Sequence, residues 1–345
     1  MDNLLSIIGA DVSSLQRSLD LGATYFNEQG SPADPLQILQ DHGVNYIRLR
    51  VWVNPPHGYN NKAKVVEFVS RIKAKGMRLL IDFHYSDTWA DPQHQGKPAA
   101  WADLDFQQLQ VSLYNHTYDI CQSLGMAGSP PDLVQIGNEI TPGMLLPDGS
   151  TGNWDKMAVL LKRGYSAVKA AHPSTLVMLH IDRGGDNSAA CTWFDHAAAR
   201  GVKWDAIGLS YYSYWQGTPA AMAANVADLK TRYGTPVVIV ETAYPFTLTE
   251  NDSEENSIHS ADQLSPEFPA TPAGQAANLR AVLEAARSAG AWGVFYWEPT
   301  WTAVKGNGWD PANPDSGDQW ENQALFDYGG RALPAMREFR SQAGS

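Results

Sequence analysis

Short apolar runs alternate with helix-like segments along almost the whole chain, and this alternation constrains the fold more than any other feature. Most runs are about four to eight residues long, rich in Val, Ile and Leu, and apolar at both alternating parities. Strands that are buried on both faces of a parallel sheet have this pattern. The expected strands are Ile7–Asp11, Asn45–Trp52, Met77–His84, Leu133–Asn138, Leu176–Ile181, Ala206–Tyr211, Pro236–Val240 and Ala291–Trp297.

Amphipathic segments lie between the expected strands, and several end on a glycine that is suited to a helix C-cap, as at Gly76, Gly125 and Gly290. The alternation of strands and helices has the count of a closed (β/α)8 barrel. Because no linker rich in Pro, Gly and Ser divides the chain, we predict an α/β protein in which residues 1–345 form one catalytic TIM-barrel domain. The expected helices are Pro35–His42, Lys62–Lys75, Phe106–Leu124, Trp154–Ala171, Thr192–Arg200, Pro219–Tyr233, Pro272–Ala289 and Ala332–Phe339.

Long segments with little periodicity follow several of the strands and are rich in Pro, Gly, Asp and Trp. In a barrel these segments are the βα loops, and active sites lie on the face that they form. We therefore expect them to form a substrate groove. The loops are Asn54–Asn61, Tyr85–Trp101, Ile140–Asn153, Tyr244–Thr271 and Pro299–Gly329.

Composition excludes several classes of protein. The 25 Lys and Arg against 37 Asp and Glu give a formal charge of −12, which argues against binding to nucleic acid or to an anionic membrane surface. No apolar run reaches the length that a membrane-spanning helix needs, so we expect no membrane insertion. With only two cysteines, Cys121 and Cys191, the chain is not a disulfide-stapled scaffold, and their pairing stays open.

Two glutamates stand directly after apolar strand residues. Glu139 follows Leu-Val-Gln-Ile-Gly-Asn, and Glu241 follows Pro-Val-Val-Ile-Val. An unpaired carboxylate is costly inside a core, whereas at the open mouth of a barrel it can serve chemistry. Two glutamates that only bond loop backbone are the alternative. Glycoside hydrolysis requires two carboxyl groups that flank the glycosidic bond, and these two strand ends can face one another over a groove.

Aromatic residues at the strand ends fit the same interpretation, because a flat apolar ring stacks on the C–H face of a pyranose. For any single one of them, packing within a loop is the alternative. The residues are Trp52, Trp89, Trp101, Tyr212, Trp215, Trp297, Trp301 and Trp309.

The chain resembles glycoside hydrolase family 53, the endo-β-1,4-galactanases, within the clan of (β/α)8 retaining glycosidases. The stretch Asp82-Phe-His-Tyr-Ser-Asp-Thr-Trp-Ala-Asp-Pro92 is the most specific match, whereas an Asn-Glu pair alone would indicate only the clan. The other matching stretches begin at Gly9, Tyr46, Val134, His180, Gly208, Val240 and Gly293, and they occur in order over nearly the whole chain.

The resemblance implies roles for individual residues. Glu139 matches the general acid/base, Glu241 the nucleophile, and Asn138 the residue that bonds the sugar 2-hydroxyl. Tyr212 matches a tyrosine that lies against the nucleophile. Arg48 and Arg50 share one strand parity, and by analogy with the clan we take Arg50 as the arginine near Glu241, with an ion pair that stabilises the barrel interior as the alternative. The remaining expected substrate contacts are His84, Asp87, Trp89, Asp182 and the platform Trp297.

The implied reaction is hydrolysis of internal β-1,4-galactosidic bonds in galactan or type I arabinogalactan, with retention and with no cofactor for the chemistry. A retaining pair predicts carboxyl groups about 5–5.5 Å apart, against roughly 6.5–9.5 Å for an inverting pair. Another retaining β-1,4-glycanase, such as a mannanase or cellulase, is the nearest alternative. The others are a non-catalytic carbohydrate-binding barrel and a metal-dependent hydrolase that uses Asp82, His84, His180 and Asp182.

A structural Ca²⁺ between the loops after the last two strands is also implied by the resemblance to bacterial members. The expected ligands are Asp252, Asn256, Ser316 and Asp318, with Glu254 through its backbone. The segment departs from the family pattern Asp-x-Asp-x-His-x-Asn, since Glu250 and Glu254 stand at its first and third positions. A solvated acidic loop without an ion is the alternative.

The expected partner is therefore a polysaccharide rather than a nucleic acid or a membrane, and we expect a monomer. A polymeric substrate implies work outside the cytoplasm, so we expect a secreted or periplasmic protein whose signal peptide is absent from this sequence.

Overall fold

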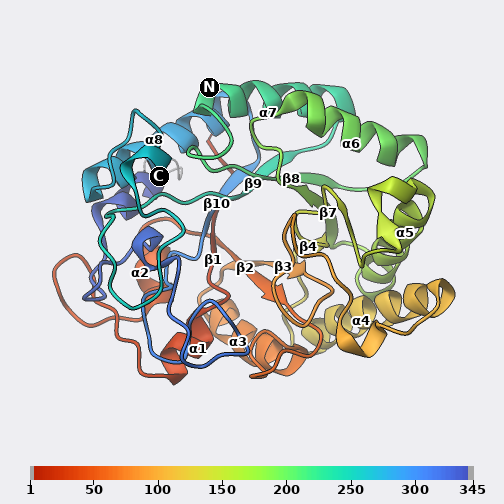
Figure 1. The fold of residues 1–345 in the computed structure, drawn as a ribbon, viewed down its shortest axis with the longest axis horizontal. Coiled ribbons are helices and arrows are strands. Elements are labelled where there is room, and N and C mark those ends of the chain that lie inside the picture. Colours follow the sequence, from red (N-terminus) through yellow and green to blue (C-terminus); the bar gives the residue numbers. More distant parts are fainter. Residues whose placement is uncertain (1–3, 341–345) are drawn as a thin grey trace.

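Parallel strands close into a barrel in the computed structural model, which describes residues 4–340 (Figure 1). Going round the barrel, the strands follow one another in chain order, and β10 pairs with β1 to close it. The TIM-barrel prediction is confirmed. The barrel strands are β1 (Ile7–Asp11), β2 (Tyr46–Val51), β3 (Arg78–Phe83), β4 (Leu133–Ile136), β7 (Leu176–Ile181), β8 (Ala206–Ser210), β9 (Val237–Glu241) and β10 (Gly293–Trp297).

Helices surround the barrel on its outer side (Figure 1). Three of them, α2, α7 and α8, begin with a proline directly after a residue whose side chain caps the first turn. Proline has no N–H to lose at that position, so these sequences start helices efficiently. The helices are α1 (Leu15–Asp20), α2 (Pro35–Asp41), α3 (Lys62–Ala74), α4 (Phe106–Met126), α5 (Trp154–Ala171), α6 (Asn187–Ala199), α7 (Pro219–Tyr233), α8 (Pro272–Ser288) and α9 (Arg337–Arg340).

Three helix predictions need correction. The expected final helix Ala332–Phe339 is instead a 3-10 turn over Pro334–Met336 followed by the short α9. Gly125 lies inside α4, and the left-handed turn that ends this helix is made by Gly128, with φ +76°. Helix α6 begins at Asn187 rather than at Thr192, because the Asp186 side chain accepts the N–H of Ala189 and caps it.

The inside of the barrel is apolar in its lower part and polar toward the carboxyl ends of the strands. A buried cluster of Ile7, Tyr46, Leu80, Leu133, Met178, Ala206, Val238, Val240 and Phe295 fills the lower part. One step up on alternate strand positions, buried polar side chains replace it, as where Arg48 follows Tyr46 and Asp82 follows Leu80. The larger apolar cluster packs the outer strand faces against the helices. The fold therefore carries its buried charges at the mouth of the barrel.

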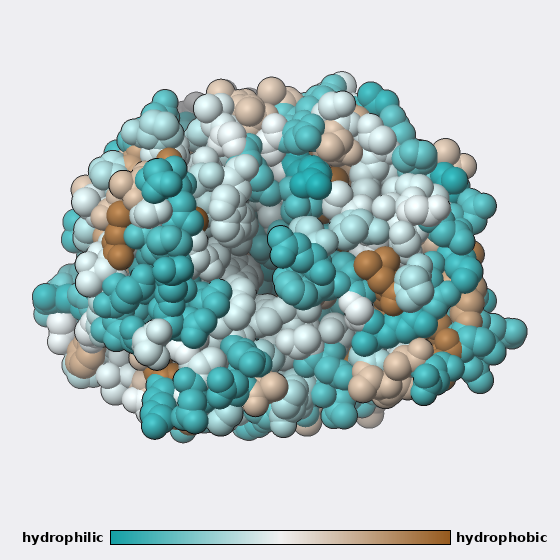
Figure 2. Space-filling view, viewed as in Figure 1, coloured by the Kyte–Doolittle hydropathy of each residue, from teal (hydrophilic) through white to brown (hydrophobic). Residues whose placement is uncertain are grey.

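The long loops lie over this polar end of the barrel (Figure 1). One of them holds a small antiparallel pair, β5 (Gly143–Met144) and β6 (Gly149–Ser150). The space-filling view from the same side shows a hollow at the centre of this face (Figure 2). Cys121 and Cys191 are both buried and free. Among the helices within residues 4–340, none combines the length and the hydropathy of a membrane span.

Candidate active site

A register irregularity turns Glu241 into the barrel. Strands β8 and β9 pair Leu209 with Ile239, but the next pair is Ser210 with Glu241, so Val240 is an extra residue on β9. Val238 and Val240 already face the interior, and strict alternation would send Glu241 to the outer face. A bulge of this kind re-aims a side chain, which explains why Glu241 points inward.

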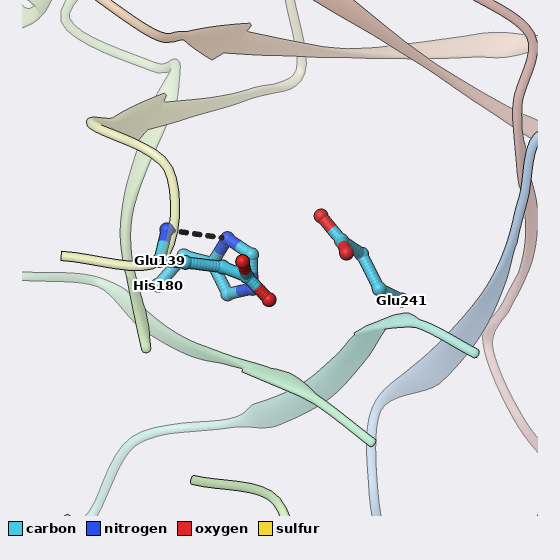
Figure 3. A group of neighbouring side chains, drawn as sticks. All are labelled: Glu139, His180 and Glu241. Carbon is cyan, nitrogen blue, oxygen red and sulfur yellow. Dashed lines mark hydrogen bonds between the residues drawn. The ribbon is translucent and has the colours of Figure 1, made fainter. Parts of the chain in front are cut away.

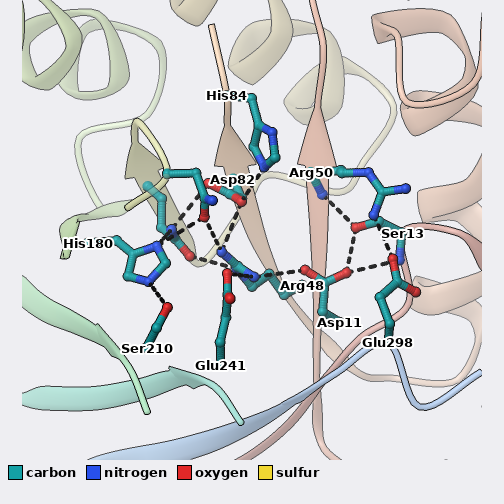
Figure 4. A network of polar contacts seen from close by, with 12 residues as sticks. Asp11, Ser13, Arg48, Arg50, Asp82, His84, His180, Ser210, Glu241 and Glu298 are labelled. Carbon is teal, nitrogen blue, oxygen red and sulfur yellow. Dashed lines mark hydrogen bonds and ion pairs between the residues drawn. The ribbon is translucent and has the colours of Figure 1, made fainter. Parts of the chain in front are cut away.

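Arg48 is the central cation of the mouth and is fully buried (Figure 4). Its Nη1 lies 2.9 Å from Glu241 Oε1 and 3.0 Å from Asp11 Oδ2, while Nη2 lies 2.9 Å from Asp82 Oδ2. Its Nε donates to Gln135 Oε1 at 2.7 Å. On the other side, the Tyr212 hydroxyl donates to Glu241 Oε2 at 2.9 Å. Both oxygens of Glu241 are thus held in one orientation.

The choice of Arg50 as the arginine near Glu241 is wrong, since Arg48 makes that contact. Both arginines face the interior, as their shared parity requires, but Arg50 lies one step closer to the solvent. Its Nη1 pairs with Glu298 Oε1 at 2.6 Å, and its guanidinium lies over the rings of Trp52 and Trp89 at 4.9 and 4.3 Å. Glu241 reaches down into the barrel and therefore meets the deeper arginine.

Glu139 sits just beyond β4 in a backbone conformation that side-chain-bearing residues rarely adopt, with φ +47°. Such strain persists only where the surroundings hold it, and it is common at functional sites. Here the main-chain N–H of Glu139 donates to His180 Nδ1 at 3.3 Å, and Gln95 Nε2 donates to the carbonyl oxygen of Asn138 at 2.7 Å. The Glu139 side chain keeps part of its surface exposed in the hollow.

The side chains of Glu139 and Glu241 extend toward one another from opposite sides of the mouth (Figure 3). A carboxylate oxygen of each lies within 4.8 Å of the other, which is far from the separation of an inverting pair. Burial, then the charge of Glu241, raise the pKa of Glu139 well above its usual range. Burial also raises the pKa of Glu241, to about 7, but Arg48 opposes the rise. Glu139 is therefore the residue of the pair that holds a proton.

His180 lies beside the two glutamates, and one of its ring nitrogens also lies within 4.8 Å of their oxygens. Among residues 4–340 this is the only group of three or more His, Cys, Asp or Glu ligand atoms this close together. Both ring nitrogens already have hydrogen-bond partners, with Gln135 and Glu139 at Nδ1 and Ser210 at Nε2. A ring nitrogen that is engaged in this way is not free to bind a metal. The arrangement favours an acid–base pair over the metal-dependent alternative.

The other expected substrate contacts all lie around the mouth. Asn138 is buried, accepting from Arg48 Nη2 at 2.8 Å and donating to the Ala90 carbonyl oxygen at 2.7 Å. His84 Nε2 faces Asp82 Oδ2 at 3.1 Å. Asp182 is partly exposed and bonds Thr141 and Arg183.

Asp87 also has partners within its own loops. Its two oxygens accept the main-chain N–H groups of Asn54 and Ala99 at 2.8 and 2.9 Å. These contacts stabilise the loops that border the hollow. Both oxygens of Asp87 are therefore already engaged by main-chain N–H groups.

The aromatic residues divide into two sets. Trp52, Trp101 and Trp301 are buried, so their rings pack within loops. Trp89, Trp297 and Trp309 keep partly exposed faces and contact one another, with centroids of Trp89 and Trp309 at 5.0 Å and of Trp89 and Trp297 at 6.0 Å. Tyr212 is buried against Glu241, and Trp215 is 57% exposed. The hollow thus has an aromatic wall beside the carboxylate pair.

The two loops expected to hold Ca²⁺ do come together. Asp318 N–H donates to Asp252 Oδ2 at 2.7 Å, and Gln319 Nε2 donates to Glu254 Oε1 at 2.9 Å. Buried oxygens of Asp318, Asn256 and Glu321 lack a hydrogen-bond partner within the described part of the chain. Hard oxygen donors without partners suit a calcium ion.

Two features of these loops differ from the expectation. Ser316 Oγ accepts the main-chain N–H of Asp310, in its own loop, at 3.1 Å. Its hydroxyl therefore already has a structural partner. Glu321, which the sequence pattern did not single out, is buried with one unpaired oxygen and is a further candidate ligand. Its signal was weak, because a lone glutamate in a loop rich in polar residues does not stand out.

Comparison with known proteins gives a consistent result over the whole barrel. The model of glycosyl hydrolase family 53 matches residues 7–339. An "Uncharacterized protein in bgaB 5'region" of Niallia circulans is 40% identical over 97% of this chain and 93% of its own length. An arabinogalactan endo-beta-1,4-galactanase of Cellvibrio japonicus is 37% identical over 99% of this chain and 92% of its own.

A solved structure, the GH53 catalytic domain of Ignisphaera aggregans, superposes with a TM-score of 0.94 at 39% identity, over 99% of this chain and 96% of that chain. The chain therefore belongs to glycosyl hydrolase family 53.

Proposed function

We propose that the protein hydrolyses internal β-1,4-galactosidic bonds of galactan or type I arabinogalactan, with retention of configuration. The observation that carries this proposal is the closeness of Glu139 and Glu241, whose oxygens lie within 4.8 Å, with Arg48 paired to Glu241 alone of the two. Family membership and a 37% identical relative named as an arabinogalactan endo-beta-1,4-galactanase support the choice of substrate.

In the first step, Glu241 attacks the anomeric carbon and forms a glycosyl ester, while Glu139 gives its proton to the leaving glycosidic oxygen. Arg48 and Tyr212 hold both oxygens of Glu241, and Arg48 favours its anionic form. The raised pKa of Glu139 keeps the proton available at neutral pH. The pKa of Glu139 is thus the more strongly raised of the two, and the cation beside Glu241 favours the anion that a nucleophile must be.

In the second step, Glu139 removes a proton from water, which attacks the anomeric carbon and releases Glu241. Once Glu241 is an ester it no longer carries a charge, so the pKa of Glu139 falls and its carboxylate becomes an effective base. Two inversions at one carbon give net retention. The partly exposed rings of Trp89, Trp297 and Trp309 offer stacking faces for the neighbouring sugars.

A panel of β-1,4-galactan, mannan, xylan and cellulose tests the substrate. We expect reducing ends to appear from galactan with a rapid fall in viscosity, which marks cleavage inside the chain. Proton NMR of the first products should show the β-anomer before mutarotation. Preferential cleavage of mannan or cellulose would favour the alternative β-glycanase, and an initial α-anomer would contradict the retaining mechanism.

We propose further that Ca²⁺ binds between the two loops after β9 and β10, with Asp252, Asn256 and Asp318 as ligands, Glu321 as a fourth, and Glu254 through its backbone. Unpaired buried oxygens on Asn256, Asp318 and Glu321 support this site. Its role would be to order the loops, so the melting temperature should fall by several degrees in EDTA and recover with Ca²⁺. Asp318→Asn should remove that response, and a melting temperature indifferent to both additions would contradict the proposal.

A galactan polymer does not cross a membrane, so we propose that the protein acts outside the cytoplasm, as a secreted or periplasmic enzyme. Cell fractionation with an antibody against the protein tests this. We also propose that it acts as a monomer, which light scattering during gel filtration would check.

A further inference from the structure

His180 holds the backbone around Glu139 at two points that the reaction scheme does not use, one on Glu139 and one on Ile140. Its ring Nδ1 accepts the main-chain N–H of Glu139 at 3.3 Å, and its carbonyl oxygen accepts the N–H of Ile140 at 3.0 Å. These two bonds lie on either side of the unusual φ of Glu139. His180 is fully buried at the end of β7, so it holds this backbone rigidly.

The neighbours of the His180 ring determine where its proton lies. Nδ1 faces two N–H donors, the Gln135 amide at 2.9 Å and the Glu139 main chain. Asn138 Oδ1 is also 3.0 Å from Nδ1, so one acceptor stands against two donors there. A proton on Nδ1 would oppose both donors, so the proton is on Nε2. Burial, with Arg48 and His84, lowers the pKa of His180 and keeps the ring neutral.

Ser210 connects the other side of the ring to the Glu139 carboxyl group. His180 Nε2 lies 2.8 Å from Ser210 Oγ, and its N–H donates to that oxygen (Figure 4). The hydroxyl hydrogen of Ser210 is then free to point elsewhere. The ring that Ser210 contacts lies within 4.8 Å of a Glu139 carboxylate oxygen, and the Ser210 side chain lowers the pKa of Glu139, against burial and the neighbouring acids. Ser210 is fully buried on β8, so water does not compete for this hydrogen.

We propose that His180 and Ser210 are positioning residues for the acid/base glutamate, with His180 fixing its backbone and orienting a Ser210 hydroxyl that donates to the Glu139 carboxylate. This inference rests on the proposed function for its role in the reaction. The chain of donors runs from Nε2–H of His180 through O–H of Ser210 to Glu139. It stabilises the carboxylate that remains after Glu139 has protonated the leaving group.

The charges around Glu139 make this bond important. Glu241 on β9, Asp182 after β7 and Asp91 in the loop after β3 all disfavour a carboxylate at this position. Arg48 on β2 pairs with Glu241, Asp82 and Asp11 instead. The Ser210 hydroxyl acts in the opposite direction to the three acids. Without the Ser210 hydroxyl, a smaller fraction of Glu139 would be the carboxylate that the second step needs as a base. That carboxylate would also be less well oriented.

Ser210→Ala tests the proposal, with Ser210→Thr as the matched control that keeps the hydroxyl. NMR titration of protein labelled with ¹³C at the glutamate carboxyl, assigned with Glu139→Gln, measures the pKa of Glu139 without substrate. Losing a hydrogen bond to a charged group should raise this pKa by about one unit in Ser210→Ala but not in Ser210→Thr. His180→Asn keeps an acceptor near the Nδ1 position but has no donor at Nε2, so we expect the same upward shift.

A kinetic assay tests the same proposal. Its substrate is an aryl galactoside oligomer with a good leaving group, for which the second step limits the rate. Ser210→Ala should lower kcat about tenfold and move the acidic limb of the kcat–pH profile upward, because the second step needs Glu139 deprotonated, while Ser210→Thr should match the native protein. An unchanged Glu139 pKa in Ser210→Ala, or a loss of kcat that is uniform over pH, would overturn the proposal. If the pKa shifts but no protein cleaves galactan, the proposed substrate fails and the positioning role stands.

Discussion

Replacing Glu241 with Gln should lower the pKa of Glu139, because the anionic Glu241 is one of the two main causes of its elevation. The change keeps the volume of the side chain and removes one negative charge at the barrel mouth. Arg48 remains, and with fewer carboxylates to balance it, its positive charge acts in the same direction. The variant imitates the glycosyl ester, in which Glu241 is also neutral.

The expected size of the shift follows from the distance between the two carboxylates. At 4.8 Å, the upper limit for the separation of their facing oxygens, and an effective dielectric constant of about 20, two unit charges interact with about 3.5 kcal/mol. One pKa unit corresponds to about 1.4 kcal/mol, so the pKa of Glu139 should fall by about 2.5 units. Burial still raises it in the variant, since the surroundings of Glu139 are otherwise unchanged.

Carbon-13 NMR titration of labelled glutamate carboxyl groups in Glu241→Gln provides the measurement. Glu298→Gln is a matched control, because Glu298 is another fully buried carboxylate at the mouth but is paired with Arg50. We expect that control to leave the Glu139 titration within about half a unit of the native value. A shift below half a unit in Glu241→Gln would refute the electrostatic coupling on which the two-step use of Glu139 depends.

The remaining predictions concern the same mouth. Glu139→Ala should lose almost all turnover on galactan, and azide should restore activity on a substrate with a good leaving group by giving a β-glycosyl azide; absence of that product would contradict its role. The native pH profile should be bell-shaped: activity falls at low pH as Glu241 is protonated and at high pH as Glu139 loses its proton, so a profile with one limb would disagree. Arg48→Met should cost about 3–5 kcal/mol in denaturant unfolding, since it leaves buried carboxylates unpaired, and a loss below about 1 kcal/mol would contradict the central role of this cation.

The barrel could be predicted from the sequence because each of its strands is buried on both faces, which leaves an apolar run that polar segments interrupt. The run from Leu176 to Ile181 and helices α5 and α7 agree with the structure at both ends. The start of α6 was missed although its signal was present, since Asp186 is a good N-cap residue and its side chain accepts from the third residue after it. The helix expected over Ala332–Phe339 was wrong, because Pro334 favours a tight turn within an otherwise helical pattern.

The depth at which a side chain lies within the barrel could not be predicted from the sequence. Arg48 and Arg50 have the same parity and similar neighbours, yet one lies among carboxylates at the centre and the other lies nearer the solvent between two tryptophans. The same holds for the tryptophans, since Trp52 and Trp301 are buried while Trp89 and Trp297 keep exposed faces. The spacing of these tryptophans in the sequence places each of them at a strand end. Which of their ring faces stay exposed depends on how the loops pack around them.

The inward turn of Glu241 has an energetic explanation. With strict alternation, Glu241 would join Val237 and Ile239 on the outer face, against apolar helices and without a cation. An unpaired buried carboxylate costs several kcal/mol, whereas the register change at Val240 forfeits ladder hydrogen bonds worth about 1 kcal/mol each. Inside, the carboxylate meets Arg48 and Tyr212. The bulge is thus the lower-energy arrangement for this sequence, and it brings Glu241 within reach of Glu139.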